Sequence, residues 1–542
     1  PMGTENMMQA VLAKVPAGLK IADLQTGFRI LSRLPLANSQ QAAFEISHFL
    51  DRLLQTPPAG EVYLQLLEQT RISLCFVAEE LARQYVNKPL PLTDNEASAF
   101  RQVVAIWQKA ARTYAHCAQL PSSIDGKVDS QRLAMILHRC IYYAGMVIVE
   151  HHRARQALPA GAWLQLHGYY SSAEEWGVAT LPVADSLDPL GRSSHCTAAF
   201  VGLLLEELAG PYGLSIREMG LLRRWVDNWS PLVSLPAVDA QGPIPELVVD
   251  LLLDCGIRSA KDRLQAGRPR RVDVARLLTE VNHVRKRLQL GGKPEQLGLG
   301  EDCSSAYCHR LLKRVHQPWS MSRAARKCRR HETSGSAKVA TGFAAIHYHI
   351  SGKEFGQLEG SRSYSREEFE SLFAFRHMLD SAQLLEIRQA QLGFALDIWQ
   401  LLDESASGFR LLRSLPGRKF EPGQLLSICP PNGSVHLLAQ VVWLMQDQGS
   451  RLLAGIAALP GRPQAVAARP TTPGPRATGS FSRAFMLPAV SSLGAEQTLI
   501  LPPGWYRPER ELEVCTEKRM RVKLLRRVGD GSDFERVSFV VL

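Results

Sequence analysis

Two short segments of the chain combine residue types that can hold a small phosphorylated ligand. The first is Arg326-Lys327-Cys328-Arg329-Arg330, in which Arg326 and Arg330 stand four positions apart and Arg329 lies beside them. Arginine forms paired hydrogen bonds with phosphate or with the O6 and N7 edge of guanine, and its plane stacks on purine rings. Two such side chains in a flexible arm can wrap around an anionic ring, so this segment is a candidate anion clamp.

The second segment, DESASG, runs from Asp403 to Gly408 at the end of a predicted strand. The Asp403 carboxylate can accept hydrogen bonds from N1 and N2 of guanine, and the short side chain of Ser405 can add one to a base or a phosphate. Gly408 permits a close backbone approach or a positive φ. Arginines that bind phosphate, together with a carboxylate that reads guanine, suit a guanine nucleotide better than a nonspecific polyanion.

In this order, and on either side of β-strands, the RxxxR and DxSxxG patterns resemble the PilZ domain, a small β-barrel that binds cyclic di-GMP through these motifs. The segments GQLLSI (423–428), QVVW (440–443) and LAGI (453–456) follow the order of the later PilZ strands. The resemblance implies that cyclic di-GMP binds at the barrel mouth. It implies these ligand-binding residues: Arg326, Arg329, Arg330, Asp403, Ser405 and Gly408.

The two motifs are 73 positions apart, from Arg330 to Asp403, whereas PilZ domains place them much closer. An insertion between two barrel strands accounts for this spacing, and it is tolerable because the entropy of loop closure grows slowly with length. The alternative is that the arginines no longer reach Asp403, since some PilZ domains have lost ligand binding and serve as docking modules.

The elements that must position these residues differ between the two halves of the chain. In the first half, apolar residues over 46–53 recur at i, i+3, i+4 and i+7, the spacing of one helix face. Thr93 with Glu96, and Ser215 with Glu218, are capping-box pairs that mark helix starts. We therefore expect a helical domain over residues 1–257.

One segment of this half, WLQLHGYYSSAEEWG, is similar to the start of a tetratricopeptide repeat. Trp163, Leu166, Tyr170 and Ala173 fit that pattern, although His167 replaces its glycine. Repeat-like helical hairpins that offer a docking surface are one hypothesis. An ordinary helix pair is the other, because no copy recurs at the repeat's period.

After Gly342 the sequence pattern changes to short segments rich in β-branched residues, separated by Gly, Pro and Asn. The predicted strands are 339–350, 394–402, 424–429, 435–445, 452–459, 498–501, 511–516, 520–526 and 534–541. Strands without helical crossovers favour an antiparallel barrel, which we place at 337–470 with a helical insertion at 353–391. Residues 483–542 complete this barrel or form a second one. The predicted fold class is multidomain α + β, helical first and PilZ-like barrel second.

Basic residues concentrate between the two halves. Residues 258–338 hold 20 Lys and Arg against seven acidic residues, a net +13, whereas the entire chain carries +11. We predict a basic helical connector at 258–336 that carries the RxxxR motif, with an anion bound at its end. A solvated connector and nucleic-acid binding are the alternatives. Nucleic acid is disfavoured because only Tyr307 and Trp319 offer aromatic stacking there.

Metal and catalytic signals are weak. Cys303, Cys308 and His309 have zinc-like spacing but no evident fourth ligand, and His347 with His349 on one face of a predicted strand lack an Asp or Cys partner. The chain has no P-loop, GxSxG elbow or HExxH motif. We therefore expect no metal, no cofactor and no enzymatic activity.

The combined prediction is a cytoplasmic, non-enzymatic receptor or adaptor for cyclic di-GMP whose helical half is reoriented by the ligand and binds a protein partner. The segment after Met2 lacks the charged and apolar regions of a signal peptide, and the apolar stretch 198–205 is too short to span a membrane. Ten cysteines without CxxC spacing fit reduced thiols. The rival hypothesis is a ligand-free interaction scaffold with a degenerate PilZ-like barrel.

Overall fold

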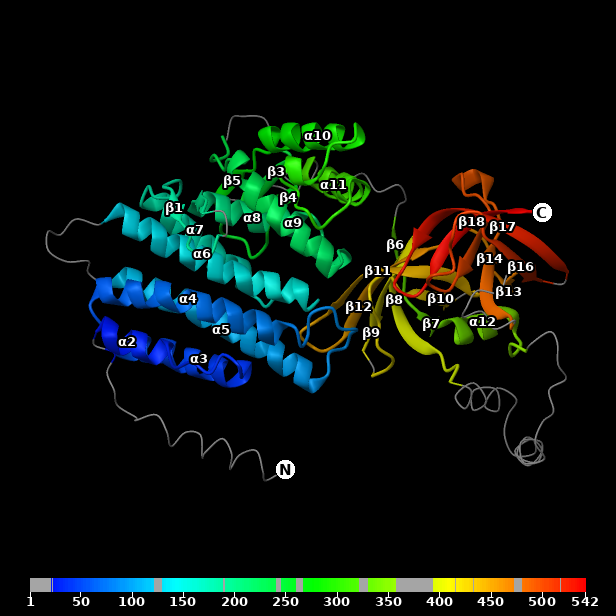
Figure 1. Ribbon diagram of the computed structural model, residues 1–542, viewed down its shortest axis with the longest axis horizontal. Helices are drawn as coiled ribbons and strands as arrows, with labels where there is room; N and C mark the ends of the chain where they lie inside the picture. Colours follow the sequence, from blue (N-terminus) through cyan, green and yellow to red (C-terminus); the bar gives the residue numbers. More distant parts are fainter. Residues whose placement is uncertain are drawn as a thin grey trace, which may run out of the picture. The chain divides into compact units, whose positions relative to one another are not determined.

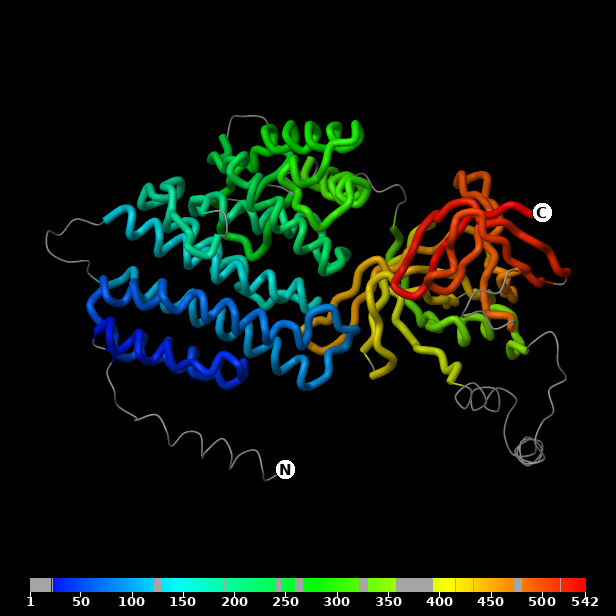
Figure 2. Tube along the Cα trace, viewed as in Figure 1, coloured from blue at the N-terminus to red at the C-terminus, as the bar shows by residue number. Residues whose placement is uncertain are grey.

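The computed structural model divides the chain into two compact units (Figure 1). Unit 1 comprises most of the chain up to Ala324, and unit 2 comprises Ala325–Leu542 with two earlier segments, Lys88–Pro91 and Arg155–Ala157. The structure describes residues 21, 23–120, 129–188, 191–239, 245–259, 267–320, 330–356, 393–414, 416–431, 433–471, 480–516 and 518–542. Figure 2 follows the same path as a tube, blue to green through unit 1 and yellow to red through most of unit 2.

Unit 1 is helical, as predicted. Its helices are α2 (Leu24–Leu31), α3 (Ser39–Gln55), α4 (Gly60–Ala82), α5 (Asp94–Gln119), α6 (Ser130–Arg153), α7 (Ala162–Glu175), α8 (Cys196–Leu208), α9 (Ile216–Trp229), α10 (Ala275–Gln289) and α11 (Ser305–Ser320). Short strands accompany them: β1 (Val183–Ala184) pairs with β2 (Ser193–Ser194), and β3 (Leu247–Asp250) lies between β4 (Arg258–Ser259) and β5 (Pro269–Arg271). Single 3₁₀ turns follow α8 (η1, Pro211–Gly213) and α9 (η2, Ser230–Leu232) and precede α11 (η3, Glu295–Leu297).

The helix starts agree with the local sequence. Thr93 and Glu96 form a reciprocal capping box at α5, and Ser215 and Glu218 form another at α9. Each box satisfies two backbone N–H groups that the helix leaves unpaired. The predicted apolar face at 46–53 is the buried face of α3.

Helix α6 is the core of unit 1 and packs against α5, α7 and α8. It is long and apolar enough to cross a membrane, yet 83% of its most apolar window is buried inside the unit. That burial is typical of a central helix in a globular core. The buried face of α7 is formed by the repeat-like residues Trp163, Leu166, Tyr170 and Ala173. Along the chain, β1 and β2 lie between α7 and α8.

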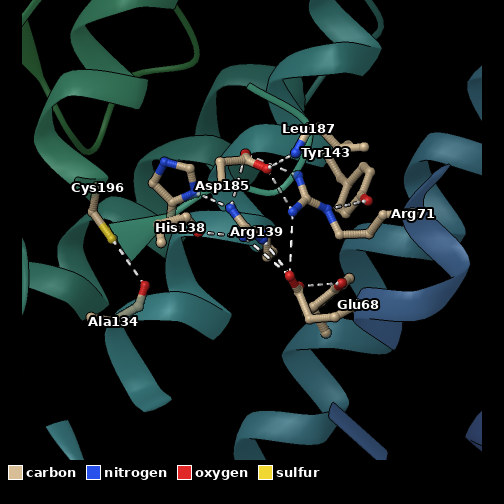
Figure 3. Close-up of polar contacts among 11 residues, drawn as sticks. Glu68, Arg71, Ala134, His138, Arg139, Tyr143, Asp185, Leu187 and Cys196 are labelled. Atoms are coloured by element: carbon tan, nitrogen blue, oxygen red, sulfur yellow. Dashed lines mark hydrogen bonds and ion pairs between the residues drawn. The ribbon is translucent and has the colours of Figure 1, made fainter. Parts of the chain in front are cut away.

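A cluster of charged side chains holds α4 and α6 to the loop after β1 (Figure 3). Arg139 donates to Glu68 through Nε and Nη2, both at 3.1 Å, and to Asp185 through Nη1 at 3.1 Å. Arg71 donates to the same two carboxylates, at 3.3 Å to Glu68 and 3.0 Å to Asp185, and its Nε reaches the Tyr143 hydroxyl at 3.2 Å. Burial raises the pKa of both carboxyl groups, but hydrogen bonds and charge from the two arginines outweigh it and hold each pKa below its ordinary value.

The predicted basic connector is wrong for residues 267–320. This stretch folds into β5, α10 and α11 of unit 1, where Leu277, Val281, Leu312 and Trp319 are buried. Six basic residues of α10 and α11 are exposed: Arg276, Lys286, Arg287, Arg310, Lys313 and Arg314. The basic residues of 267–320 therefore belong to the surface of unit 1 and not to a linker.

Unit 2 contains a six-stranded antiparallel barrel, which confirms the predicted antiparallel barrel. Its strands are β7 (Ser336–Thr341), β8 (Asp397–Ser405), β9 (Gly408–Arg413), β10 (Leu425–Cys429), β11 (Leu437–Gln446) and β12 (Leu452–Ala458). The order is β8-β7-β10-β11-β12-β9, and β9 pairs back with β8 to close the ring. A short strand, β6 (His331–Glu332), pairs with β8 beyond the end of β7.

The predicted strand at 339–350 is wrong after Thr341. Gly342 adopts a φ of 81° and turns the chain into helix α12 (Phe343–Ser351). Such a φ suits glycine because it has no Cβ. In this helix Ala345, Ile346 and His347 are buried. The predicted helix inside 353–391 lies almost entirely outside the described residues.

Residues after the first barrel form a second closed barrel and do not complete the first. Its strands are β13 (Gln464–Pro470), β14 (Ser482–Leu487), β15 (Thr498–Leu501), β16 (Glu511–Cys515), β17 (Arg519–Asp530) and β18 (Glu535–Val541), with a 3₁₀ turn, η4 (Ser491–Leu493), before β15. The barrel therefore starts with β13, ahead of the expected boundary at 483.

The two barrels and α12 share one apolar cluster. Ile346 of α12 packs there with Leu425 of β10 and Phe485 of β14. The backbone N–H of Leu425 also donates to Asp533 Oδ1 at 2.7 Å, and that of Ser532 donates to the Gly423 carbonyl at 3.1 Å. Apolar burial and hydrogen bonds thus join the barrels inside unit 2.

Candidate ligand-binding site on the first barrel

Strand β6 brings the end of the arginine motif to the aspartate motif. Its residues pair in register with β8, His331 with Glu404 and Glu332 with Asp403. Arg330 directly precedes β6, and its Nη1 donates to Asp403 Oδ1 in an ion pair. The two side chains are 29% and 17% exposed, so the pair is reachable from solvent. Two predicted site residues that are 73 positions apart therefore meet.

The turn between β8 and β9 places Ser405 and Gly408 opposite each other. Ser405 Oγ donates to the Gly408 carbonyl at 3.2 Å and accepts from the Ser407 N–H at 3.4 Å. A Cβ on Gly408 would lie 2.2 Å from the carbonyl oxygen of Ile456 on β12. Of the two reasons proposed for a glycine here, close backbone approach is the one that the structure supports.

Arg410 is a neighbour of the site that the motifs do not include. It pairs with Asp403 across β8 and β9, and its Nη1 lies 3.9 Å from Asp403 Oδ2. Asp403 therefore lies between two guanidinium groups, from Arg330 and Arg410. The alternation along β9 could have revealed it, since Phe409 and Leu411 are buried and Arg410, between them, is exposed.

The two other predicted arginines, Arg326 and Arg329, lie outside the described residues. Within the described chain, the site consists of a pair of opposite charges at a strand end, a second arginine beside it, and a tight serine–glycine turn. Such a set offers guanidinium groups to phosphates and a carboxylate to the donor edge of guanine.

Comparisons with known families match both ends of the chain. The model described as "Cyclic-di-GMP receptor FimW, N-terminal domain" matches residues 27–240, and the "FimW C-terminal beta-barrel domain" matches residues 466–542. Together they cover more than half of the chain. The chain belongs to the FimW family.

A curated member of the FimW family, the cyclic-di-GMP receptor FimW of Pseudomonas aeruginosa, is 22% identical to this chain. The alignment covers 93% of this chain and 88% of that protein. The N-terminal FimW model falls within unit 1 apart from the short segments Lys88–Pro91 and Arg155–Ala157, and the C-terminal model coincides with the second barrel. The first barrel and its candidate site lie between the two matched regions.

Other predicted sites in this FimW family member have different roles. Cys303 and Cys308 are paired with each other as a disulfide, and His309 Nε2 lies 3.0 Å from Gln289 Nε2. In the described residues no three His, Cys, Asp or Glu side chains group in a way that could hold a metal ion.

The two histidines of the predicted strand lie on helix α12. His347 packs edge-on against Phe355, 5.1 Å between ring centroids, and burial lowers its pKa to about 4. His349 stacks on His436 at 5.1 Å, and its Nε2 lies 2.8 Å from the carbonyl oxygen of Phe394. Both side chains therefore contribute to the packing of α12.

Proposed function

We propose that this chain is a non-enzymatic receptor for cyclic di-GMP that acts in the cytoplasm. The ligand binds to the outside of the first barrel, where Arg330 meets Asp403. The observation that carries this proposal is the pairing of β6 with β8, because it brings the two motifs together despite their separation. The name of the Pseudomonas relative supports the same ligand.

Each side chain has a role that follows from its chemistry. Arg330 binds a phosphate or the O6 and N7 edge of guanine, together with Arg326 and with Arg329 as a helper. Asp403 accepts from guanine N1 and N2 once Arg330 turns toward the ligand, and Ser405 adds a hydrogen bond. Gly408 allows the turn to pack closely against the backbone of β12.

Calorimetric titration of the full chain with cyclic di-GMP tests the proposal. We expect binding in the unmodified chain and a loss of at least about tenfold in affinity for Arg330→Ala and for Asp403→Ala, because each removes a charge-assisted hydrogen bond. Arg451→Ala is the matched control, since Arg451 pairs with Asp447 at 2.7 Å in the turn after β11. Its affinity should not change.

Two results contradict the proposal in different ways. No heat at high micromolar ligand rejects cyclic di-GMP as the ligand and favours a ligand-free scaffold. Full affinity in Arg330→Ala and Asp403→Ala rejects the site and keeps the ligand.

Two short segments from the first half of the chain lie in unit 2 and suggest how the effect of ligand binding reaches unit 1. In unit 2, Leu90 and Phe420 exchange backbone hydrogen bonds of 2.8 and 2.7 Å, and Gln446 bonds to Arg155 and Ala157 at 2.9 and 2.8 Å. The chain continues from these segments into α4, α5, α6 and α7. We infer that ligand binding at β8 and β9 is passed along these segments to unit 1 and changes its binding of a protein partner. Hydrogen exchange at the Leu90 and Ala157 amides should change when ligand is added, and no change would reject this route.

The outer faces of α10 and α11 favour a second candidate, nucleic-acid binding. These helices carry seven Lys and Arg residues and one acidic residue, Glu280. Such a surface predicts weak, sequence-independent binding of DNA or RNA that falls steeply with salt. Binding of a labelled duplex at 50 and 200 mM salt separates the two functions, because cyclic di-GMP binding through Arg330 does not require α10 or α11.

A further inference from the structure

Four residues of the first barrel form a row across neighbouring strands. Asp403 of β8 pairs with Arg410 of β9, Arg410 pairs with Gly455 of β12, and Gly455 pairs with Trp443 of β11. Directly paired residues of an antiparallel sheet project from the same face. The row therefore extends the surface that carries the Arg330–Asp403 pair.

This face is the outside of the barrel. Arg410 is 45% exposed, whereas its neighbours Phe409 and Leu411 are buried. At the far end of the row, Leu444 is buried and the preceding residue, Trp443, is partly exposed. The described side chains of the row are thus open to a ligand from solvent.

Gly455 lets the indole of Trp443 lie across β12. A Cβ on Gly455 would be 2.0 Å from Trp443 Nε1 and 2.4 Å from its Cε2, closer than atoms can approach. The φ of Gly455 is not positive, so its backbone alone does not require glycine. The absent side chain is what makes room for the ring.

β-Bulges lie next to both ends of the row. The register shifts between Leu401 and Asp403 on β8 and between Val441 and Trp443 on β11. Bulges re-aim side chains and are common beside binding sites. Here the bulges lie beside Asp403 and Trp443, and the Trp443 ring lies over Gly455 of β12, the strand next to that of Arg410.

The row could contact a larger part of a cyclic dinucleotide than Arg330 and Asp403 could contact alone. The indole of Trp443 reaches across β12 to Gly455, so the ring lies one strand, about 5 Å, from the strand of Arg410, which in turn is the neighbour of Asp403. A carboxylate with a guanidinium stands at one end, a second guanidinium in the middle and an aromatic ring at the other end. A purine ring can stack on the indole while Arg410 binds a phosphate.

We propose that Trp443 and Arg410 form a second part of the ligand site, in which Trp443 stacks on a guanine and Arg410 binds a phosphate of the ligand. This inference rests on the proposed function, since it concerns the same ligand. The competing explanation is that Trp443 only covers the backbone of Gly455. The two explanations differ in whether ligand affinity depends on the aromatic ring.

The test is titration of the full chain with cyclic di-GMP by calorimetry, with thermal melting measured in parallel. Trp443→Leu keeps an apolar cover and removes the ring, so we expect about tenfold weaker binding. Trp443→Phe should keep most of the affinity. Gly455→Ala leaves the indole in the chain but displaces it, and should weaken binding to a similar extent. Trp176→Leu, at an exposed tryptophan of unit 1, is the control and should bind normally.

Arg410→Met gives an independent readout. Loss of a phosphate contact should weaken binding and make the affinity less sensitive to salt. Normal affinity in Trp443→Leu and Gly455→Ala, alongside weak binding by Arg330→Ala, overturns this inference and leaves the proposed function intact. A lower melting temperature with unchanged affinity also overturns it, in favour of the purely structural role. No binding by the unmodified chain overturns both.

Discussion

Replacing Arg139 with methionine should destabilise unit 1 by about 3 kcal/mol, because it breaks a buried ionic cluster and leaves carboxylates undercompensated. Arg139 is fully buried and donates to Glu68 twice, to Asp185, and to the Ala184 carbonyl at 3.0 Å. Methionine fills a similar volume, so the loss is mainly electrostatic. Glu68 and Asp185 keep Arg71 as a partner and are partly exposed, which places the cost at the low end of the usual range of about 3–5 kcal/mol.

Urea denaturation followed by far-ultraviolet circular dichroism measures this cost on the full chain. Arg83→Met is the matched control, since Arg83 pairs with Glu80 at 3.0 Å on α4 but is 70% exposed. An exposed pair contributes about 0–1 kcal/mol, so the control should change stability little. A cost for Arg139→Met below about 1 kcal/mol, or equal to that of Arg83→Met, would refute the reasoning.

The pH dependence of the same variant adds a second check. Burial raises the pKa values of Glu68 and Asp185, but the hydrogen bonds and charges of the arginines outweigh it. Both pKa values therefore lie below their ordinary 4.5 and 3.8. The unfolded chain therefore binds these protons more readily, and the stability from the cluster is present above those ordinary values and lost as the pH falls below them. Arg139→Met should show a shallower loss of stability below pH 4.5.

Three further predictions concern unit 2. Gly408→Ala should cost about 1–3 kcal/mol in urea denaturation, since the methyl would meet a backbone carbonyl at 2.2 Å, whereas Gly529→Ala on β17, with open space around it, should be close to neutral. Burial lowers the pKa of His436 to about 4, so the melting temperature should fall as the pH drops from 6.5 toward 4, and His436→Gln should reduce that dependence. Burial raises the pKa of Asp533 to about 6, so ionisation opposes folding above that pH; Asp533→Asn should melt higher than the unmodified chain at pH 7 and similarly at pH 4.

The helical half could be predicted because its signals are local. A capping box such as Thr93 with Glu96 is decided by four consecutive residues, and an apolar stripe such as 46–53 by two helical turns. The sequence did not predict that the basic residues of 275–320 lie on two helices of unit 1, α10 and α11. A charge count does not distinguish a linker from two amphipathic helices, and the apolar residues Leu277, Val281 and Leu312 carried the decisive signal.

The error at residues 342–351 has a different cause. The segment FAAIHYHIS is a short apolar and aromatic run, and it follows Gly342 with its positive φ. A short apolar run of this kind is compatible with either a buried strand or a buried helix segment. Ala345 and Ile346 are buried in a cluster with Leu425 of the first barrel and Phe485 of the second, which are 79 and 139 positions from Ile346, so no local pattern could reveal this contact.

The candidate site shows which part of a binding surface a sequence can reveal. Asp403, Ser405 and Gly408 belong to one hairpin, so their mutual geometry follows from a short motif. The contact between Arg330 and Asp403 depends on the two residues of β6, which pair with β8. A strand of two residues is too short to be predicted from a local sequence pattern. The row from Asp403 to Trp443 depends on the registers of three strand pairs.

Both glycines of this surface are explained by what approaches them rather than by their own backbone. Gly408 admits the Ile456 carbonyl and Gly455 admits the Trp443 ring, and neither has a positive φ. Because Gly408 meets rigid backbone while Gly455 meets a movable side chain, the same change to alanine should act differently at the two positions. At Gly408 it should mainly lower the free energy of unfolding, and at Gly455 it should mainly lower ligand affinity. A pair of variants at neighbouring strands thereby separates the fold of the first barrel from its binding surface.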